Sequence, residues 1–378
     1  MGGRAGILVA VLLLTALTSR TAAADGRATE PLDNVDEGAP IGQAAPPTAA
    51  GRTEIPGSPI RAGLEAFAQY GYRGTKTAEG GTHWTHAFDV PRVHGAVEGR
   101  WRRSRGRVVV EATRLADDTS ATSSTGDGLV FRVREAWGSF QVAPGLEVSA
   151  GVIPTLTIPE LDGTWMLRPV AASSLQTQNL LAPADLGAKM RYDLPGGYGW
   201  IASAAFNGDG YNSRKLNTGS DVESAIELHP FAKDRTFLPL ALFASLNLGT
   251  RNVESVRSNR FTTGLLWQGE RLRLGAVATW AYGVANVHDQ TAILATWFAR
   301  VEPVPRVLLG ARIDHVIRNL EAPTADKLTS FWATAGYRIA VPIETFLALS
   351  RALATTRAER EMKESDLWEA RVVGRVVF

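Results

Sequence analysis

The sequence predicts an all-β protein, a transmembrane up-and-down antiparallel β-barrel of 16 strands. Apolar and polar residues alternate with a period of two from residue 60 onward, as in strands with one apolar and one polar face. Short turn-rich connections alternate with longer polar ones, which is typical of barrels in the outer membrane. The last segment, Asp366 to Phe378, reads as an amphipathic strand that ends on an aromatic residue. Together these observations favour a membrane barrel.

The first 24 residues are predicted to be a secretory signal peptide. Arg4 precedes the apolar run Ile7 to Leu14, and Ala22 to Ala24 supply small residues for cleavage before Asp25. The alternative, a membrane anchor, is disfavoured because the run is shorter than the roughly 20 residues of a spanning helix. The sequence contains no Cys, which excludes disulfide scaffolds, zinc ribbons and lipid attachment through Cys.

Charge and composition define the rest of the chain. Lys plus Arg total 40 against 38 Asp plus Glu, and removal of a signal peptide that carries Arg4 and Arg20 leaves 38 of each. Proteins that bind nucleic acid are usually strongly basic, so we expect no nucleic-acid partner. Residues 25–58 are rich in Ala, Gly, Pro and Thr, cannot bury a core and are predicted to be a flexible periplasmic leader. The barrel is therefore expected over residues 59–378.

The strand number follows from the connections. The long segments are 74–85, 116–127, 154–184, 208–221, 250–258, 285–289, 319–328 and 355–365. Eight long loops imply eight hairpins, hence 16 strands. The 320 residues from 59 to 378 then allow 20 per strand and connection, which leaves room for about 9–11 residues per crossing. A secreted β-sandwich is the alternative, but it needs neither this alternation of connections nor a terminal aromatic residue.

Aromatic residues are expected to form girdles at the two membrane surfaces. We predict a periplasmic girdle near the short turns, which contains Trp101, Trp200, Trp267 and Trp297. An outer girdle near the long loops is predicted to contain Trp84, Tyr282 and Trp368.

The lumen of a 16-strand barrel is wide enough for water, so its inward residues should be polar. Arg outnumbers Lys 34 to 6, and rings of permanently charged guanidinium groups favour anions. We expect ten residues to line the pore and guide anions: Arg100, Arg132, Arg134, Asp162, Arg168, Lys189, Arg191, Arg312, Arg338 and Arg371. Further inward candidates are Arg107, Arg271, Arg273 and Arg375. In the alternative interpretation, these arginines pair with inward acids such as Glu98, Glu111, Asp314 and Glu369 and stiffen the wall without selectivity.

Motifs for catalysis or metal binding are missing from the sequence. There is no Gly-x-Ser-x-Gly, no phosphate-binding glycine loop, no His-Glu-x-x-His and no Cys nucleophile. His83 and His86 lie in a predicted loop, and their spacing would place them on opposite faces of a strand. Asn207 to Gly210 resembles only a fragment of a calcium loop and is predicted to be a turn. We therefore expect no enzymatic activity, no metal and no cofactor.

Two pairs of segments in the first half of the chain resemble a known family. Val133 to Trp137 is followed by Gly145 to Pro154, and Leu186 to Ala188 by Phe206 to Gly210. The first pair is similar to the strand, turn and strand that lead into the third loop of the phosphate-selective porin family of Gram-negative outer membranes, and the second pair resembles the next hairpin and loop of that family. The resemblance covers about residues 60–235 and implies a 16-strand barrel, usually a homotrimer, whose lumen carries arginines and lysines that guide phosphate or other anions.

One departure concerns the phosphate site. The family's phosphate trap relies on clustered lysines, whereas the lysines here are scattered: Lys76, Lys189, Lys215, Lys233, Lys327 and Lys363. Phosphate specificity is therefore not carried over. In many porins the third outer loop folds into the lumen, and the segment 154–184 with Asp162 and Arg168 is expected to form such a constriction. The alternative is a surface loop that covers the barrel mouth.

We thus expect an outer-membrane porin, surrounded by lipid and assembled as a homotrimer, that allows passive diffusion of small hydrophilic or anionic solutes. A closed barrel that serves as an adhesin or structural anchor through its outer loops is the alternative, and single-channel conductance separates the two. An outer-membrane hydrolase would need an exposed Ser near a His at the barrel rim, and the sequence offers no such pair.

Overall fold

The computed structural model describes residues 53–54, 60–76, 81–114, 129–208, 210–211, 219–250, 257–284, 287, 290–321, 327–340, 343–355 and 367–377. The predicted signal peptide lies outside the described residues, as does Phe378 at the end of the last predicted strand. Of the predicted leader, only Thr53–Glu54 is described, and it forms the short strand β1.

The remaining strands follow one another along the chain. They are β2 (Ile60–Lys76), β3 (Thr82–Trp101), β4 (Ser104–Arg114), β5 (Leu129–Ala143), β6 (Leu146–Pro154), β7 (Ala184–Asp193), β8 (Gly199–Phe206), β9 (Asp221–Leu228), β10 (Leu240–Leu248), β11 (Asn259–Gln268), β12 (Leu272–Tyr282), β13 (Thr291–Val301), β14 (Val307–Ile317), β15 (Lys327–Ala340), β16 (Ile343–Ala354) and β17 (Leu367–Val377).

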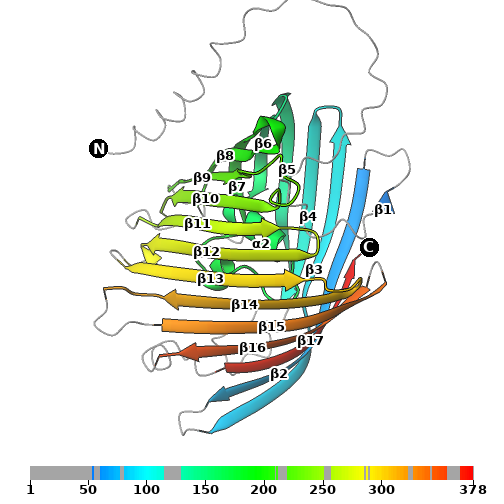
Figure 1. Ribbon diagram of the computed structural model, residues 1–378, viewed down its shortest axis with the longest axis vertical. Helices are drawn as coiled ribbons and strands as arrows, with labels where there is room; N and C mark the ends of the chain where they lie inside the picture. The colour runs from blue at the N-terminus through cyan, green and yellow to red at the C-terminus, as the bar shows by residue number, and fades with distance from the viewer. Residues whose placement is uncertain are drawn as a thin grey trace, which may run out of the picture. The chain divides into compact units, whose positions relative to one another are not determined.

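Strands β2 to β17 form a closed antiparallel barrel (Figure 1). Each pairs with the next, β10 pairs with β9, and β17 returns to β2 through pairs such as Val373 with Gln69. Strand β1 pairs with β2 through Thr53 and Ala62. The predicted fold class, a 16-strand antiparallel barrel, is confirmed. Closure matters because it leaves no unpaired strand edge, as a structure in hydrocarbon requires.

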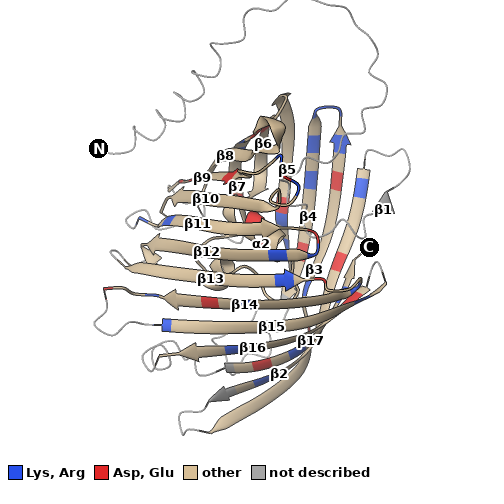
Figure 2. Cartoon of the chain, in the orientation of Figure 1, with Lys and Arg blue, Asp and Glu red and all other residues tan. Residues whose placement is uncertain are grey.

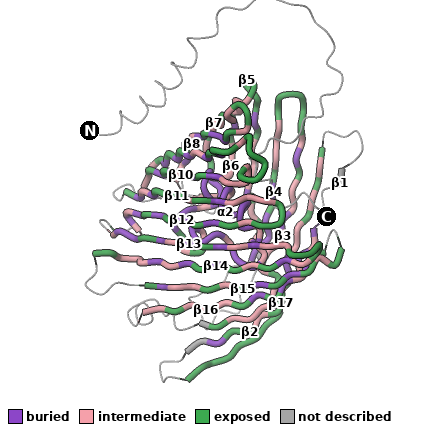
Figure 3. Tube along the Cα trace, viewed as in Figure 1, coloured by how far each residue is buried: buried purple, intermediate pink, exposed green. Residues whose placement is uncertain are grey.

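Side chains alternate between the outer and inner faces as the sequence predicts. On β12, Trp280 is 53% exposed on the outer face, whereas the adjacent Thr279 and Ala281 are buried. The alternation of exposed and buried residues is visible along the strands in Figure 3. Trp200, which we predicted for the periplasmic girdle, was placed wrongly: it is inward and 2% exposed because its indole N–H donates to Glu227 at 3.1 Å.

The described connections follow the predicted pattern with two differences, and the predicted loop 116–127 lies outside the described residues. Residues 74–85 were predicted as a loop, but β2 continues to Lys76 and β3 begins at Thr82. Stacking of Tyr72 on Trp84, with ring centroids 4.9 Å apart, extends this hairpin. His86, and His83 before it, therefore lie on a strand. The second difference is the link from β9 to β10, which spans residues 229–239 and is much longer than a tight turn.

Two short helices were not predicted from the sequence. The long segment between β6 and β7 holds α2 (Thr157–Trp165) and α3 (Ser174–Thr177), and a single 3₁₀ turn, η1 (Pro195–Gly197), joins β7 to β8. In the described part of the chain, no helix has the length and apolar character needed to cross a bilayer. We call residues 155–183 the third-loop segment.

Candidate functional site

The third-loop segment packs inside the barrel against one half of its wall. Helix α2 contacts β11, β12 and β13, and α3 contacts β13. Buried apolar residues of the segment form one cluster with inward residues of these and neighbouring strands. The segment contributes Leu161, Trp165, Leu167, Leu175 and Leu180, and the wall contributes Phe243, Leu266, Val277, Phe298 and Phe346. The hydrophobic effect thus holds the segment to this wall.

A buried carboxylate from the wall caps the start of α2. Glu223 on β9 accepts hydrogen bonds from the backbone N–H groups of Leu156, at 2.9 Å, and Thr157, at 3.0 Å. The Thr157 hydroxyl donates to the same carboxylate at 2.6 Å. The first N–H groups of a helix have no partner within it, and a negative charge is favourable at this end. Glu223 therefore fixes where α2 begins.

Arginines of the wall donate to backbone carbonyls of the third-loop segment. Arg312 on β14 reaches Ala172 O at 2.6 Å, and Arg371 on β17 reaches Val170 O at 2.7 Å. Arg273 on β12 reaches Gly163 O at 3.0 Å. Arg312 also lies over the ring of Trp165, 5.5 Å from its centroid. Arg312 and Arg371, predicted to line the pore, thus bind the loop backbone.

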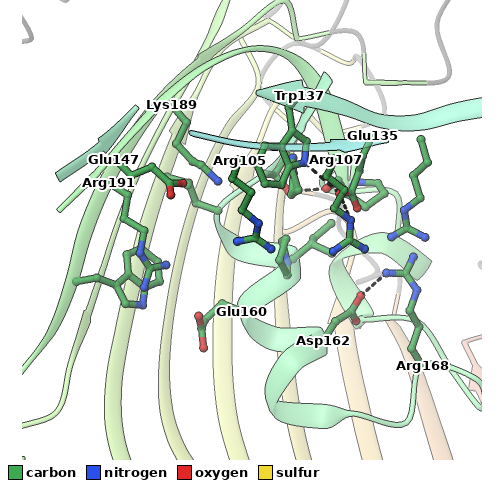
Figure 4. A pocket seen from close by; sticks show the side chains of 18 residues that line it. Arg105, Arg107, Glu135, Trp137, Glu147, Glu160, Asp162, Arg168, Lys189 and Arg191 are labelled. Atoms are coloured by element: carbon green, nitrogen blue, oxygen red, sulfur yellow. Dashed lines mark hydrogen bonds and ion pairs between the residues drawn. The ribbon is translucent and has the colours of Figure 1, made fainter. Parts of the chain in front are cut away.

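A cavity of about 220 Å³ lies between α2 and the opposite wall, which is formed by strands β4 to β8 (Figure 4). Its charged residues are six cations, Arg105, Arg107, Arg134, Arg168, Lys189 and Arg191, and four acids, Glu135, Glu147, Glu160 and Asp162. Six minus four leaves a formal charge of +2. The cavity is therefore a cationic space inside the barrel. Predicted residues Arg134, Asp162, Arg168, Lys189 and Arg191 come together in it.

The acids on α2 are largely neutralised. Asp162 accepts from Arg168 at 2.8 Å and from the backbone N–H of Ser173 at 3.0 Å. Burial and the nearby Arg134 lower the pKa of Arg168 to about 10. Burial, and next the charge of Glu227, raises the pKa of Glu160 well above that of an ordinary carboxyl. This shift favours the neutral form of Glu160, which adds to the excess of positive charge in the cavity.

Two aromatic rings support the cations of the cavity. The Arg105 guanidinium lies 5.3 Å from the centroid of Trp137, and that of Arg191 lies 4.4 Å from the centroid of Trp200. Such contacts hold a guanidinium in place while leaving its charge intact. Figure 4 shows Arg105, Arg107 and Lys189 extending from the wall toward α2.

A second cluster surrounds Glu111 on β4, which is fully buried. Arg92 and Arg132 approach its carboxylate at 2.9 and 2.8 Å, and His94 at 3.0 Å. The hydroxyl of Tyr211 donates to Glu111 at 3.0 Å, and burial, then the charge of Glu111, raises the pKa of that phenol. Arg132, a predicted pore residue, is thus part of an ion-pair network.

Two predicted pore residues pair with acids away from the cavity. Arg100 lies 3.3 Å from Glu98, and Arg338 lies 3.2 Å from Glu344. Arg271 was wrongly expected to be inward: it is exposed in the turn before β12. Arg105 was missed, although its spacing from Arg107 on β4 places both on the same face.

Among the residues that the structure describes, no three His, Asp or Glu side chains come close enough together to hold a metal ion. His83 and His86 lie on β3, and both are exposed.

Comparisons with known proteins identify the fold. The sequence matches no protein-family model and no curated protein. Its structure is similar to an anion-selective porin from Comamonas acidovorans, with a TM-score of 0.62, 11% identity and coverage of 85% of this chain and 100% of that one. OmpF of Salmonella typhi, in complex with daunomycin, is similar with a TM-score of 0.60 and 10% identity, and the match covers 86% of this chain and 100% of OmpF. The outer membrane channel DcaP of Acinetobacter baumannii is similar with a TM-score of 0.58 and 11% identity, and the match covers 87% of this chain and 100% of DcaP. At such identities the likeness concerns the fold, a porin barrel.

Proposed function

We propose that this protein is a porin of a Gram-negative outer membrane that allows passive diffusion of small hydrophilic solutes and prefers anions. The apolar outer face of the barrel suits contact with lipid, and the fold is one that porins use. The charged cavity between α2 and strands β4 to β8 is the observation that carries the anion preference, because six cations face four acids there. Excess positive charge at a narrow point attracts anions and repels cations. The function includes no catalysis and no cofactor.

The predicted pore residues divide into three groups under this proposal, and Arg105 joins the first. Arg134, Arg168, Lys189 and Arg191, together with Arg105 and Arg107, face the solute and guide anions, and Asp162 orients Arg168. Arg100, Arg132 and Arg338 are mainly balanced by wall acids. Arg312 and Arg371 hold the third-loop segment, which forms the constriction.

Planar-bilayer recording in a salt gradient tests the proposal. We expect a reversal potential of the sign that indicates anion preference. Neutralising two cavity cations together, Arg107→Gln with Lys189→Met, should move the reversal potential toward that of a non-selective pore. Arg73→Gln is the matched control, because Arg73 pairs with Glu369 at 3.1 Å and does not line the cavity. An unchanged reversal potential in the double variant would reject the role of these cations.

The alternative function is a closed barrel that acts as an adhesin or structural anchor. One observation favours it: the third-loop segment packs apolar side chains into the lumen against the wall. A closed barrel passes almost no current, so conductance of the refolded full chain distinguishes the two functions.

We also propose a homotrimer. Its support is a row of small outward residues, in which Gly99 pairs with Gly106 and Gly106 with Gly138 across β3, β4 and β5. Small residues let two membrane-embedded surfaces approach closely. The mass of the detergent-solubilised particle, measured by light scattering with the detergent contribution subtracted, tests this proposal. A particle with the mass of one chain would contradict it.

A further inference from the structure

Two cations of the cavity are less fully paired than the others. The Nε of Arg107 is buried without a hydrogen-bond partner among the described residues, and its ion pairs with Glu135 and Glu98 are long, at 3.4 and 3.9 Å. For Lys189, within the described ranges, the structure records no hydrogen bond and no ion pair. A buried donor such as the Arg107 Nε normally has a partner, whereas Lys189 is half-buried and open to the cavity. Both side chains line the cavity, so a solute carboxylate there would meet the positive charge of each.

The same cavity also has an apolar side. Trp137, Pro154 and Pro159 line it and are only half-buried, so part of their apolar surface faces the solute. Trp137 is held by a hydrogen bond to Glu135 at 3.2 Å and by the Arg105 guanidinium over its ring. Its indole is therefore a fixed surface. A hydrated inorganic anion gains little from such a surface, whereas an organic ring does.

We propose that the cavity preferentially binds aromatic monocarboxylates, with the carboxylate held by the cavity cations, which include Arg107 and Lys189, and the ring against Trp137. This inference rests on the proposed function, because the cavity must lie on the path of the solute. The volume of about 220 Å³ corresponds to roughly seven water molecules, which is enough for one benzene ring with its carboxylate. The carboxylate of such a molecule matches the cationic side of the cavity, and its flat apolar ring matches the apolar side.

Benzoate and acetate separate the contributions of the two sides. Both carry one carboxylate, and only benzoate has a ring. If the ring loses about half of its apolar surface to the protein, benzoate should bind about tenfold more tightly than acetate. Inorganic phosphate, which has charge but no apolar body, serves as the third probe.

The experiment measures binding and current on the same refolded full chain. Isothermal titration of the detergent-solubilised protein gives the affinity for benzoate, acetate and phosphate, and block of chloride current in planar bilayers reports access from the pore. Trp137→Leu should reduce the benzoate preference toward that of acetate, and Trp137→Phe, which keeps a ring, should retain it. Lys189→Met should weaken benzoate and acetate alike. Arg73→Gln should change neither, because Arg73 does not line the cavity.

The outcomes are distinct. Preferential benzoate binding that Trp137→Leu removes supports the proposal. An anion-selective channel that binds benzoate no better than acetate overturns this inference and leaves the proposed function intact. Tighter binding of phosphate than of benzoate also overturns it. If benzoate binds in the titration but the protein carries no current in bilayers, the proposed function is rejected. If there is neither current nor benzoate binding, the proposed function and this inference are both rejected.

Discussion

The two halves of the barrel wall differ in what they present to the lumen. Strands β3 to β7 present charges along their length, such as Glu98, Arg107 and Arg134, whereas β10 to β13 present uncharged side chains, such as Phe243 and Phe298, between charged residues near the strand ends. In Figure 2, β10 to β13 carry charges only near their ends, if at all. The third-loop segment packs on the apolar half because burial of its leucines is favourable there. The charged half is left facing the cavity. One side of the wall thus holds the third-loop segment, and the other side faces the cavity.

The largest effect is expected from removing the main apolar anchor of the loop. Trp165 is 2% exposed, packs edge-on against Phe298 with centroids 5.7 Å apart, and donates to Ala171 O at 3.0 Å. Trp165→Ala should weaken loop docking by about 3–5 kcal/mol and raise single-channel conductance, while the closed strand pairing remains. Trp101→Ala, on the outer face, is the control. Unchanged conductance would mean that the loop does not depend on the apolar half.

A smaller effect is expected at the helix cap. Glu223→Gln keeps the shape of the side chain but removes the charge that three donors contact, and hydrogen bonds to charged groups contribute about 1.5–3 kcal/mol. Limited proteolysis should therefore cut within residues 155–183 faster than in the parent protein. Glu302→Gln, near the turn after β13, should leave the cleavage rate unchanged. Equal cleavage in both variants would argue against the cap.

A pH effect follows from Glu160. Burial and the adjacent Glu227 raise its pKa, and Gln268 contacts both carboxyls, at 2.8 and 3.1 Å. Because the folded state holds this proton more tightly than the unfolded chain, its contribution to stability is complete below the ordinary carboxyl pKa. That contribution is lost as the pH rises through the raised pKa. Two basic side chains lie near the pair of Glu160 and Glu227, namely Arg191 and His229. The hydrogen bond of His229 to Glu227 raises the pKa of the imidazole.

Channel recordings from the ordinary carboxyl pKa upward test this pH effect. We expect current fluctuations to increase as Glu160 ionises beside Glu227 and α2 loosens. Glu160→Gln cannot ionise and should remove the change. The same pH dependence in the variant would assign the effect to another group.

The smallest effect is expected for ion pairs open to water. Arg100 has a side chain that is 56% exposed, and its contact with Glu98 is 3.3 Å long. Exposed pairs contribute about 0.2–1 kcal/mol, so Arg100→Gln should change the denaturation midpoint little. Its reversal potential should stay close to that of the parent. A large shift in selectivity would move Arg100 into the group that guides anions.

The wall of the barrel could be predicted from the sequence because each strand carries its own signal. A period of two is local, and turn residues such as Gly145 and Pro195 mark the strand ends. That information suffices for strand number, the two faces and most loops. Trp200 was misplaced because its inward position depends on Glu227, which is distant in sequence.

The candidate site was predicted less completely, because side-chain partners are not visible in a periodic pattern. Arg312 and Arg371 are inward as expected, but only the folded loop reveals the carbonyls they contact. Helix α2 is short and begins at a cap that Glu223 supplies from another strand, so its own residues contain little helix signal. Arg105 shares a face with Arg107 and could have been found by the same alternation.

The position of the third-loop contacts along the chain bears on how the protein assembles. The polar partners that hold residues 155–183 come from Glu223 to Arg371, between 66 and 201 residues away from the backbone groups they bind. Contacts between such distant residues form late, because the chain must first be ordered over the intervening length. A nascent barrel therefore starts out with an undivided interior, and the third-loop segment docks only once the C-terminal strands have arrived.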